Sequence, residues 1–299
     1  MRFERTMNGS ASGRSFAHAL ILALWFTGSS PAQAQQVNLQ PSGASTSPVV
    51  SNGRMPPPQP ITSFAIDRTE VTIGEVDAFA QATGFVSQAE REGGGYVFNG
   101  GWVRRPGWTW RTPFGVPASA DEPAVHLSFA EAQAVCLWRG MKLPTDAQWV
   151  EAGHTERRPE PPPEFEHGRS YPYPTGNQPE GANCLGDCGQ APTVAAQSSA
   201  GDRGRGHARA GQTKAGVNGL FDMGANAWEW VDEVVGAERR TRGGSWWYGA
   251  AQMHVDHRAS KPAHFFAVYV GFRCVRDRLS ARIRPPERPS RPAMTYSLP

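Results

Sequence analysis

Side chains that bind metals or move protons gather in one short stretch of this sequence. Met253, His254, Asp256, His257 and Arg258 stand almost next to one another. Methionine and histidine are ligands for copper, and histidine with aspartate suits iron or zinc. His254 and His257 are close enough in sequence to meet at one ion, with Asp256 as a ligand or orienting a ring nitrogen. The alternative is a solvated loop in which a buried Arg258 makes a structural salt bridge.

The four cysteines offer a second kind of chemistry. Cys184 and Cys188 are near neighbours and can close a small loop, which would leave Cys136 to pair with Cys274. Four cysteines allow three pairings, and an even number in an exported protein favours disulfides. The alternative is a zinc site of two cysteines and two histidines, although the spacing is not that of a standard zinc finger.

The N-terminal segment predicts export. Three arginines stand within the first 14 residues, residues 17–26 are apolar, and Ala32 and Ala34 give a small-x-small cleavage pattern. Residues 1–34 are therefore expected to be a cleaved signal peptide of a periplasmic or secreted protein. The alternative is a membrane anchor, but the apolar run is shorter than the roughly 20 residues that span a bilayer. We expect no membrane span after cleavage.

Composition divides the rest of the chain. Residues 35–60 are rich in Gln, Pro, Ser and Gly and are expected to form a disordered linker, and residues 279–299 a disordered Pro/Arg tail. The domain is expected over residues 61–278. The 33 Gly and 26 Pro exclude a helical bundle. The formal charge of +3 gives no strong basic footprint, so no nucleic-acid partner is expected.

Three capping boxes predict helices that hold the domain together. They begin at Thr72, Ser128 and Thr145, each followed three residues later by Glu or Gln. Residues 63–67 alternate as a strand does, and beyond about residue 155 the chain is rich in turns. Helices followed by short, irregular strands predict an α+β domain. The expected core includes four tryptophans, Trp228, Trp230, Trp246 and Trp247.

Several stretches, in one order, resemble the formylglycine-generating enzyme (sulfatase-modifying factor) family. The main ones are residues 64–72, 123–129, 143–149, 218–223, 226–230, 242–246 and 271–274. Together they cover about residues 61–275. The resemblance implies a single C-type-lectin-like α+β domain with little regular secondary structure and bound calcium.

The resemblance also implies particular calcium ligands. The first set has the carboxylates of Asp222 and Glu229 with the carbonyls of Ala225 and Ala227. The second set has Asn183 and Asp202 with the carbonyls of Cys184 and Gly204. Hard oxygen ligands of this kind suit calcium. The alternative for Asp222 and Glu229 is an ordinary pair of solvated loop carboxylates.

The catalytic centre is where the sequence departs from the family. The resemblance implies a Cys136–Cys274 disulfide, but Tyr248 and Met253 stand where the family has its copper-binding cysteine pair. Cu(I) chemistry needs such thiolates, so classical formylglycine generation by that pair is excluded.

The remaining polar and aromatic residues of the same region become the candidates. The catalytic candidates are Ser245, Tyr248, His254 and His257, with copper or iron as a possible cofactor at the two histidines. The substrate-binding candidates are Trp228, Ser245 and Arg258. His126 is expected to be a structural hydrogen-bonding residue.

These features predict an exported family member that lacks the cysteine pair. We expect a diverged periplasmic enzyme that oxidises or matures a peptide or a peptide-derived small molecule. The alternative is a catalytically silent, calcium-stabilised peptide-binding module or envelope scaffold.

Overall fold

Local hydrogen bonds between side chains and backbone set the helix starts. The computed structural model describes residues 57–186, 188 and 206–278, within one compact unit. Three helices follow the predicted capping boxes, namely α1 (Ile73–Thr83), α3 (Phe129–Trp138) and α4 (Asp146–His154). A fourth, α2 (Gln88–Arg91), follows a box of Ser87 and Glu90 that the prediction missed. Each box satisfies backbone amides that the first helical turn leaves free.

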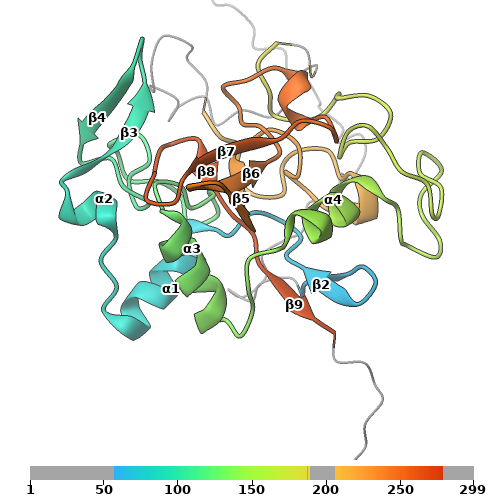
Figure 1. Cartoon of the computed structure of the whole chain (residues 1–299), viewed down its shortest axis with the longest axis horizontal. Helices are drawn as coiled ribbons and strands as arrows, with labels where there is room; N and C mark the ends of the chain where they lie inside the picture. Colours follow the sequence, from blue (N-terminus) through green and yellow to red (C-terminus); the bar gives the residue numbers. More distant parts are fainter. Residues whose placement is uncertain (1–56, 187, 189–205, 279–299) are drawn as a thin grey trace, which may run out of the picture. The chain divides into compact units, whose positions relative to one another are not determined.

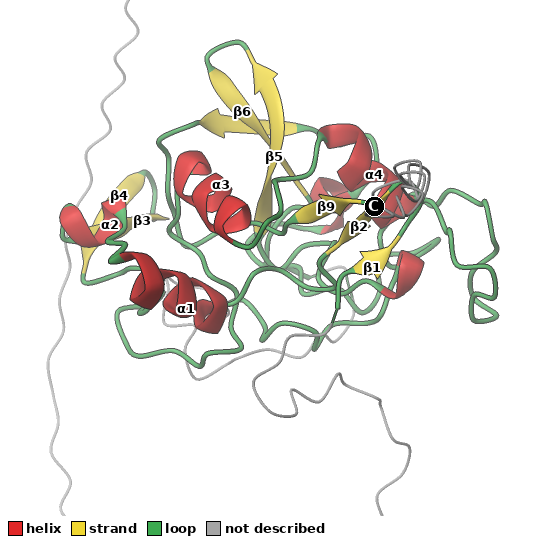
Figure 2. Ribbon diagram, turned by 90° about the horizontal axis from the view of Figure 1, so that it is seen from below, coloured by secondary structure: helices red, strands yellow, loops and turns green. Residues whose placement is uncertain are grey.

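The described strands form three small sheets. β1 (Gln59–Pro60), β2 (Phe64–Ile66) and β9 (Val275–Asp277) make an antiparallel sheet, and β3 (Gly94–Phe98) pairs with β4 (Trp102–Pro106). The largest sheet has the order β7 (Ala259–Pro262), β6 (Glu238–Arg242), β5 (Trp228–Val235), β8 (Val270–Gly271). β5 and β8 are parallel, and the other pairs are antiparallel. Figures 1 and 2 show this sheet between the β3–β4 hairpin and the β1–β2–β9 sheet.

The expected α+β domain with little regular secondary structure is confirmed. Two single turns of 3-10 helix, η2 (Val217–Gly219) and η3 (Ala250–Met253), interrupt long loops in the second half. β1 lies inside the expected linker, because Gln59 and Pro60 pair with β2. The folded part therefore begins before residue 61. The expected signal peptide, most of the linker and the tail lie outside the described residues.

Buried aromatic side chains join the helices to the central sheet. The largest cluster brings residues of α1 and α3 against β5 and β8, and it includes Trp228, Trp230 and Trp246. Trp247 is only partly buried and packs against that cluster. Three of the four predicted core tryptophans are thus buried. Among the described residues, no helix is long and apolar enough to cross a bilayer.

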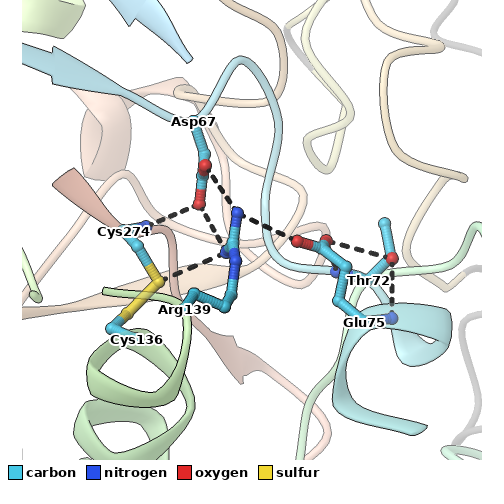
Figure 3. Close-up of a disulfide and its surroundings, with 6 residues drawn as sticks. All are labelled: Asp67, Thr72, Glu75, Cys136, Arg139 and Cys274. Atoms are coloured by element: carbon cyan, nitrogen blue, oxygen red, sulfur yellow. Dashed lines mark hydrogen bonds and ion pairs between the residues drawn. A yellow bond between two sulfur atoms is a disulfide. The ribbon is translucent and has the colours of Figure 1, made fainter. Parts of the chain in front are cut away.

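Both expected disulfides are present, and they use all four cysteines. Cys136 of α3 bonds to Cys274, next to β9, and Cys184 bonds to Cys188. Figure 3 shows Asp67 beside the first disulfide, where it accepts hydrogen bonds from Arg139 and from the Cys274 amide. Arg139 also pairs with Glu75, 3.1 Å away, in the capping box of α1. The alternative of a zinc site on the cysteines is wrong.

The two disulfides are expected to differ in their effect on stability. Cys136 and Cys274 are 138 residues apart, whereas Cys184 and Cys188 are 4 apart. The chain-entropy model assigns about 5 kcal/mol to the longer closure and about 2 kcal/mol to the shorter one. We expect the Cys136→Ser/Cys274→Ser variant to lose more free energy of unfolding than Cys184→Ser/Cys188→Ser in denaturant titrations. Equal losses would contradict this assignment.

Candidate functional site

The turn after β6 directs the chain into the loop that carries most candidate residues. Gly243 and Gly244 both have positive φ angles, of 93° and 80°. A Cβ atom on Gly243 would lie 2.9 Å from the Met223 carbonyl oxygen, so the turn requires glycine on both counts. The following Ser245 is completely buried, and its carbonyl accepts a hydrogen bond from the Tyr248 amide. Ser245 is thus built into the turn, and its burial argues against a role as nucleophile.

The two candidate histidines line one hollow. This histidine hollow, of about 380 Å³, is formed by Tyr173, Ala251, His254, Asp256 and His257. The His254 Nδ1 atom accepts a hydrogen bond from the Asp256 amide at 3.3 Å and lies 3.5 Å from the Asp256 carboxylate. The Tyr173 ring packs edge-on against His254. The Asp256 amide therefore orients the His254 ring, and a metal-binding role of the Asp256 carboxylate stays a prediction.

An aromatic cluster adjoins the histidine hollow through His257. The ring centroid of Trp228 lies 5.7 Å from those of Tyr248 and His257. Lys261 lies over the same indole, with Nζ 4.3 Å from its centroid. The candidates Trp228, Tyr248 and His257 are thus brought together, with a lysine that the prediction did not include.

Arg242 holds the loop in place. It is 2% exposed, pairs with both carboxylate oxygens of Asp146, and donates to the carbonyls of Val255 and His257. Burial, Arg242 and Lys261 together lower the pKa of His257. The expectation of a buried, structural Arg258 is wrong, because Arg258 is exposed. Arg242 has that role instead.

The expected copper or iron site lacks further ligands of the usual kind. Among the described residues, no three His, Cys, Asp or Glu side chains lie close enough to hold one metal ion. Met253 is buried and contacts the Cys188 sulfur rather than the histidine hollow. Metal chemistry at His254 and His257 would therefore need ligands from solvent or substrate.

The carboxylates of the first expected calcium set are buried, not solvated. Glu229 is enclosed by Arg273, which donates to both its oxygens at 2.7–2.9 Å, and by the Trp149 indole N–H at 2.7 Å. Asp222 accepts hydrogen bonds from the Gly211 amide and the Thr213 hydroxyl. The alternative of ordinary surface carboxylates is wrong.

A third buried carboxylate, Glu70, lies close to Asp222 and Glu229. It accepts hydrogen bonds from the Asn226 side chain and the Ala227 amide. Burial and the nearby Asp222 and Glu229 raise the pKa of Glu70 well above its usual value. Three buried carboxylates thus face the single guanidinium of Arg273, and buried charge without a partner is costly. Carboxylate oxygens suit a hard cation such as calcium, but these three do not converge closely enough to hold one ion by themselves, so a site here would need backbone carbonyls as well.

The turn between these carboxylates is held in an unusual backbone conformation. Asp222, Ala225 and Asn226 all have positive φ angles, which cost free energy for residues other than glycine. Asn226 is anchored by the Ala208 amide, and its own amide donates to the Asn183 carbonyl. This turn sets the direction of the Ala225 and Ala227 backbone.

Only part of the second expected calcium set can be placed. Asp202 and Gly204 lie outside the described residues. Asn183 is buried, and its side-chain amide donates to the Gly206 carbonyl and the Asn226 side chain. Cys184 is in the short disulfide.

Two buried histidines complete the description. The His126 ring, at Nε2, hydrogen bonds to the Pro113 carbonyl, in the structural role that was predicted. His154, at the end of α4, contacts the Tyr171 carbonyl through Nδ1, while Nε2 has no hydrogen-bond partner. Burial is the main cause that lowers the pKa of His154 to about 4, with smaller effects from Arg242 and His254.

The prediction missed Arg242, His154 and Lys261 as parts of this region. Arg242 belongs to a stretch that was used only as a family motif, and His154 to a stretch that was predicted only to be a helix. Composition could have drawn attention to Lys261, because lysine is rare in this chain. Only three of its 30 basic residues are lysines, namely Lys142, Lys214 and Lys261.

A family model and several known proteins are similar to this chain. The sulfatase-modifying factor enzyme 1-like domain family matches residues 32–278. The formylglycine-generating enzyme of Bos taurus is 26% identical over 73% of this chain and 67% of its own length. A Mus musculus protein named inactive C-alpha-formylglycine-generating enzyme 2 is 27% identical over 67% of this chain and 68% of its own. The solved structure of PvdO from Pseudomonas aeruginosa aligns with a TM-score of 0.49 and 19% identity, over 72% of this chain and 80% of PvdO.

The burial of His154 predicts a pH dependence of stability. The pKa of His154 is about 4 in the folded chain and near 6.5 when unfolded. As the pH falls from 6.5 to 4, the unfolded chain takes up a proton that the folded chain resists, so stability is lost, by about 3 kcal/mol for this group. We expect His154→Gln to reduce the fall of Tm across this window.

Other groups act in the same pH range in both proteins, and His126 and Glu75 are two of them. His126 has the same lowered pKa, and Glu75, with its pKa raised to about 7, acts in the opposite direction between pH 4.5 and 7. Both contributions cancel when the variant is compared with the wild type. His264→Gln is the control, because His264 is exposed. Identical profiles for wild type and His154→Gln would refute the assignment.

Proposed function

Because the chain belongs to the sulfatase-modifying factor enzyme 1-like domain family, we propose that it binds a peptide or peptide-derived ligand at the histidine hollow without generating formylglycine. Members of this family have the C-type-lectin-like α+β fold that the resemblance implied, and this chain has it too. The observation that carries the proposal is the state of the cysteines. All four are in disulfides, so the described part of the chain offers no thiol pair for Cu(I).

The surroundings of the hollow support ligand binding. Aromatic and imidazole rings lie beside an open cavity, and a few polar groups are positioned by Asp256 and Arg242, as in small-ligand sites. One relative is named as an inactive formylglycine-generating enzyme, so a member of this family without that activity has a precedent.

A second candidate is a diverged enzyme that oxidises or matures its peptide ligand. It is favoured by the two histidines on one hollow, which could hold copper or iron with ligands from solvent or substrate. Metal analysis by plasma mass spectrometry distinguishes the candidates. Stoichiometric copper or iron that is lost in His254→Ala/His257→Ala would favour the enzyme, and its absence the binding protein.

We further propose export to the periplasm or the cell exterior, directed by residues 1–34. Two disulfides in a chain of this size suit an oxidising compartment. The proposal of structural calcium rests on the buried carboxylates Glu70, Asp222 and Glu229, whose charge exceeds that of Arg273. Asp222, with the Ala225 and Ala227 carbonyls, would hold the ion, while Glu229 would share its carboxylate with Arg273.

The calcium proposal predicts stabilisation by the free ion. At a hundredfold excess over Kd, binding to the folded chain adds about 2.7 kcal/mol. We expect EGTA to lower the Tm of the wild type and calcium to restore it, with a much smaller effect on Asp222→Asn. Asp256→Asn is the control, because Asp256 lies at the hollow instead. If neither EGTA nor calcium changes the Tm of the wild type, calcium does not bind at this site.

The binding proposal is tested with a peptide library and one matched control. We expect peptides selected on the wild-type protein to bind His254→Ala/His257→Ala at least about tenfold more weakly, because both rings line the hollow. His264→Ala, a nearby exposed histidine outside the hollow, should bind as the wild type does. Equal binding by all three proteins would contradict a ligand site at the hollow.

The absence of formylglycine generation is a separate prediction. A cysteine-containing sulfatase peptide, incubated with the protein, Cu(I) and oxygen, is expected to keep its mass. Loss of mass characteristic of cysteine conversion would show that the chain generates formylglycine by other residues.

A further inference from the structure

Lys261 stands out as an amine without a salt-bridge partner among the described residues. It lies on β7, at the edge of the largest sheet, and is partly exposed. Its Nζ donates to the Thr241 hydroxyl at 2.8 Å and sits over the Trp228 ring. Neither contact brings a negative charge to the amine, and the indole face gives it only a cation–π contact. The other two lysines differ, since Lys142 pairs with Asp277 and Lys214 is exposed.

The charges around Lys261 do little to stabilise an ammonium. Glu238, on the neighbouring β6, is the acidic group that acts on it, and its carboxylate accepts a hydrogen bond from Ser260. Arg239, opposite Lys261 in the β6–β7 ladder, is directed to Asp232 and the Phe129 ring.

Arg242 and Lys261 both act on His257, and with burial they lower the pKa of its ring. Burial is the main cause that lowers the pKa of Lys261 to about 7.

We propose that Lys261 is a nucleophilic amine that captures an aldehyde- or ketone-bearing ligand as an imine beside Trp228 and His257. This inference rests on the proposed ligand site, because His257 belongs to both the histidine hollow and this aromatic cluster. The neutral amine is the form that attacks a carbonyl carbon, and a lysine with a pKa of about 7 on a partly exposed edge is about half neutral at pH 7. The flat indole face can pack against a planar imine.

The reaction needs no oxidant or cofactor. The nitrogen lone pair of Lys261 forms a bond to the carbonyl carbon, giving a carbinolamine. The C–O bond then breaks, and a C=N bond replaces it. Both protons of the amine leave with the oxygen as water, and His257 is the nearby group that can pass a proton during this exchange.

Reductive trapping on the full chain tests the proposal, with two lysines as internal controls. The protein is treated with propanal and cyanoborohydride at pH 7, and alkylation of each lysine is followed by peptide mass spectrometry. We expect Lys261 to react at least about tenfold faster than Lys142 and Lys214, since far more of it is neutral at this pH. A rate for Lys261 at or below that of Lys142 would overturn the proposal.

A second variant separates an activated amine from simple accessibility. Glu238→Gln keeps the acceptor for Ser260 but removes the negative charge, so the rate at Lys261 near pH 6 should rise about two- to fivefold. The rates at Lys142 and Lys214 should not change. No change at Lys261 would refute charge control of its reactivity.

The outcome is independent of the peptide-binding test. If Lys261 reacts as an ordinary lysine while His254→Ala/His257→Ala still weakens peptide binding, the amine proposal fails and the proposed function stands. If Lys261 is selectively trapped but the histidine variant binds peptides normally, the proposed ligand at the histidine hollow fails. The reactive amine then stands as a separate site.

Discussion

The buried ion pair between Arg273 and Glu229 is the interaction on which the rest of this structure depends. Neither side chain is exposed to solvent, and the guanidinium also donates to the carbonyls of Asp67 and Phe221. Trp149 of α4 adds a hydrogen bond to the same carboxylate. One residue thus ties β5, α4 and two loops to the C-terminal strand. Removing one partner of such a pair leaves a buried charge, at a cost of about 3–5 kcal/mol.

The neighbouring residue extends this connection. Cys274 follows Arg273 and is bonded to Cys136 of α3, while Asp67 joins its amide to Arg139. The short stretch that ends the domain therefore links β5, α3, α4 and two loops. A fold with so little regular secondary structure relies on such side-chain links, because backbone ladders hold only a few of its residues.

Local features of the fold could be predicted from the sequence. Capping boxes at Thr72, Ser128 and Thr145 depend on residues three apart, so their geometry follows from the sequence itself. The grouping of His254, Asp256 and His257 in one hollow is local for the same reason. The Cys136–Cys274 pairing spans 138 residues, and it came from the family resemblance rather than from spacing.

The rest depended on contacts between distant segments. Ser245 and Tyr248 have similar positions in the sequence, but only the fold shows that Ser245 is buried. Lys261 reaches Trp228 because β7 pairs with β6 and β6 with β5, a register that no local pattern determines. Arg242, rather than the expected Arg258, is the buried arginine of this loop, because a motif gives residue types and not burial.

The position of Arg242 shows how a site can change while this fold is kept. Its guanidinium pairs with Asp146 and donates hydrogen bonds to the Val255 and His257 carbonyls. It therefore fixes the backbone path of residues 255–257, whatever their side chains are. Because these contacts are to backbone carbonyls, they leave the side chains of residues 255–257 free to vary in chemistry. Side chains of different chemistry, such as the imidazoles and the amine found here, can then occupy this region without a cost to the buried network around Glu229. The chemistry of the site is therefore decoupled from the interactions that stabilise the domain, as expected where function resides in side chains placed on a retained fold.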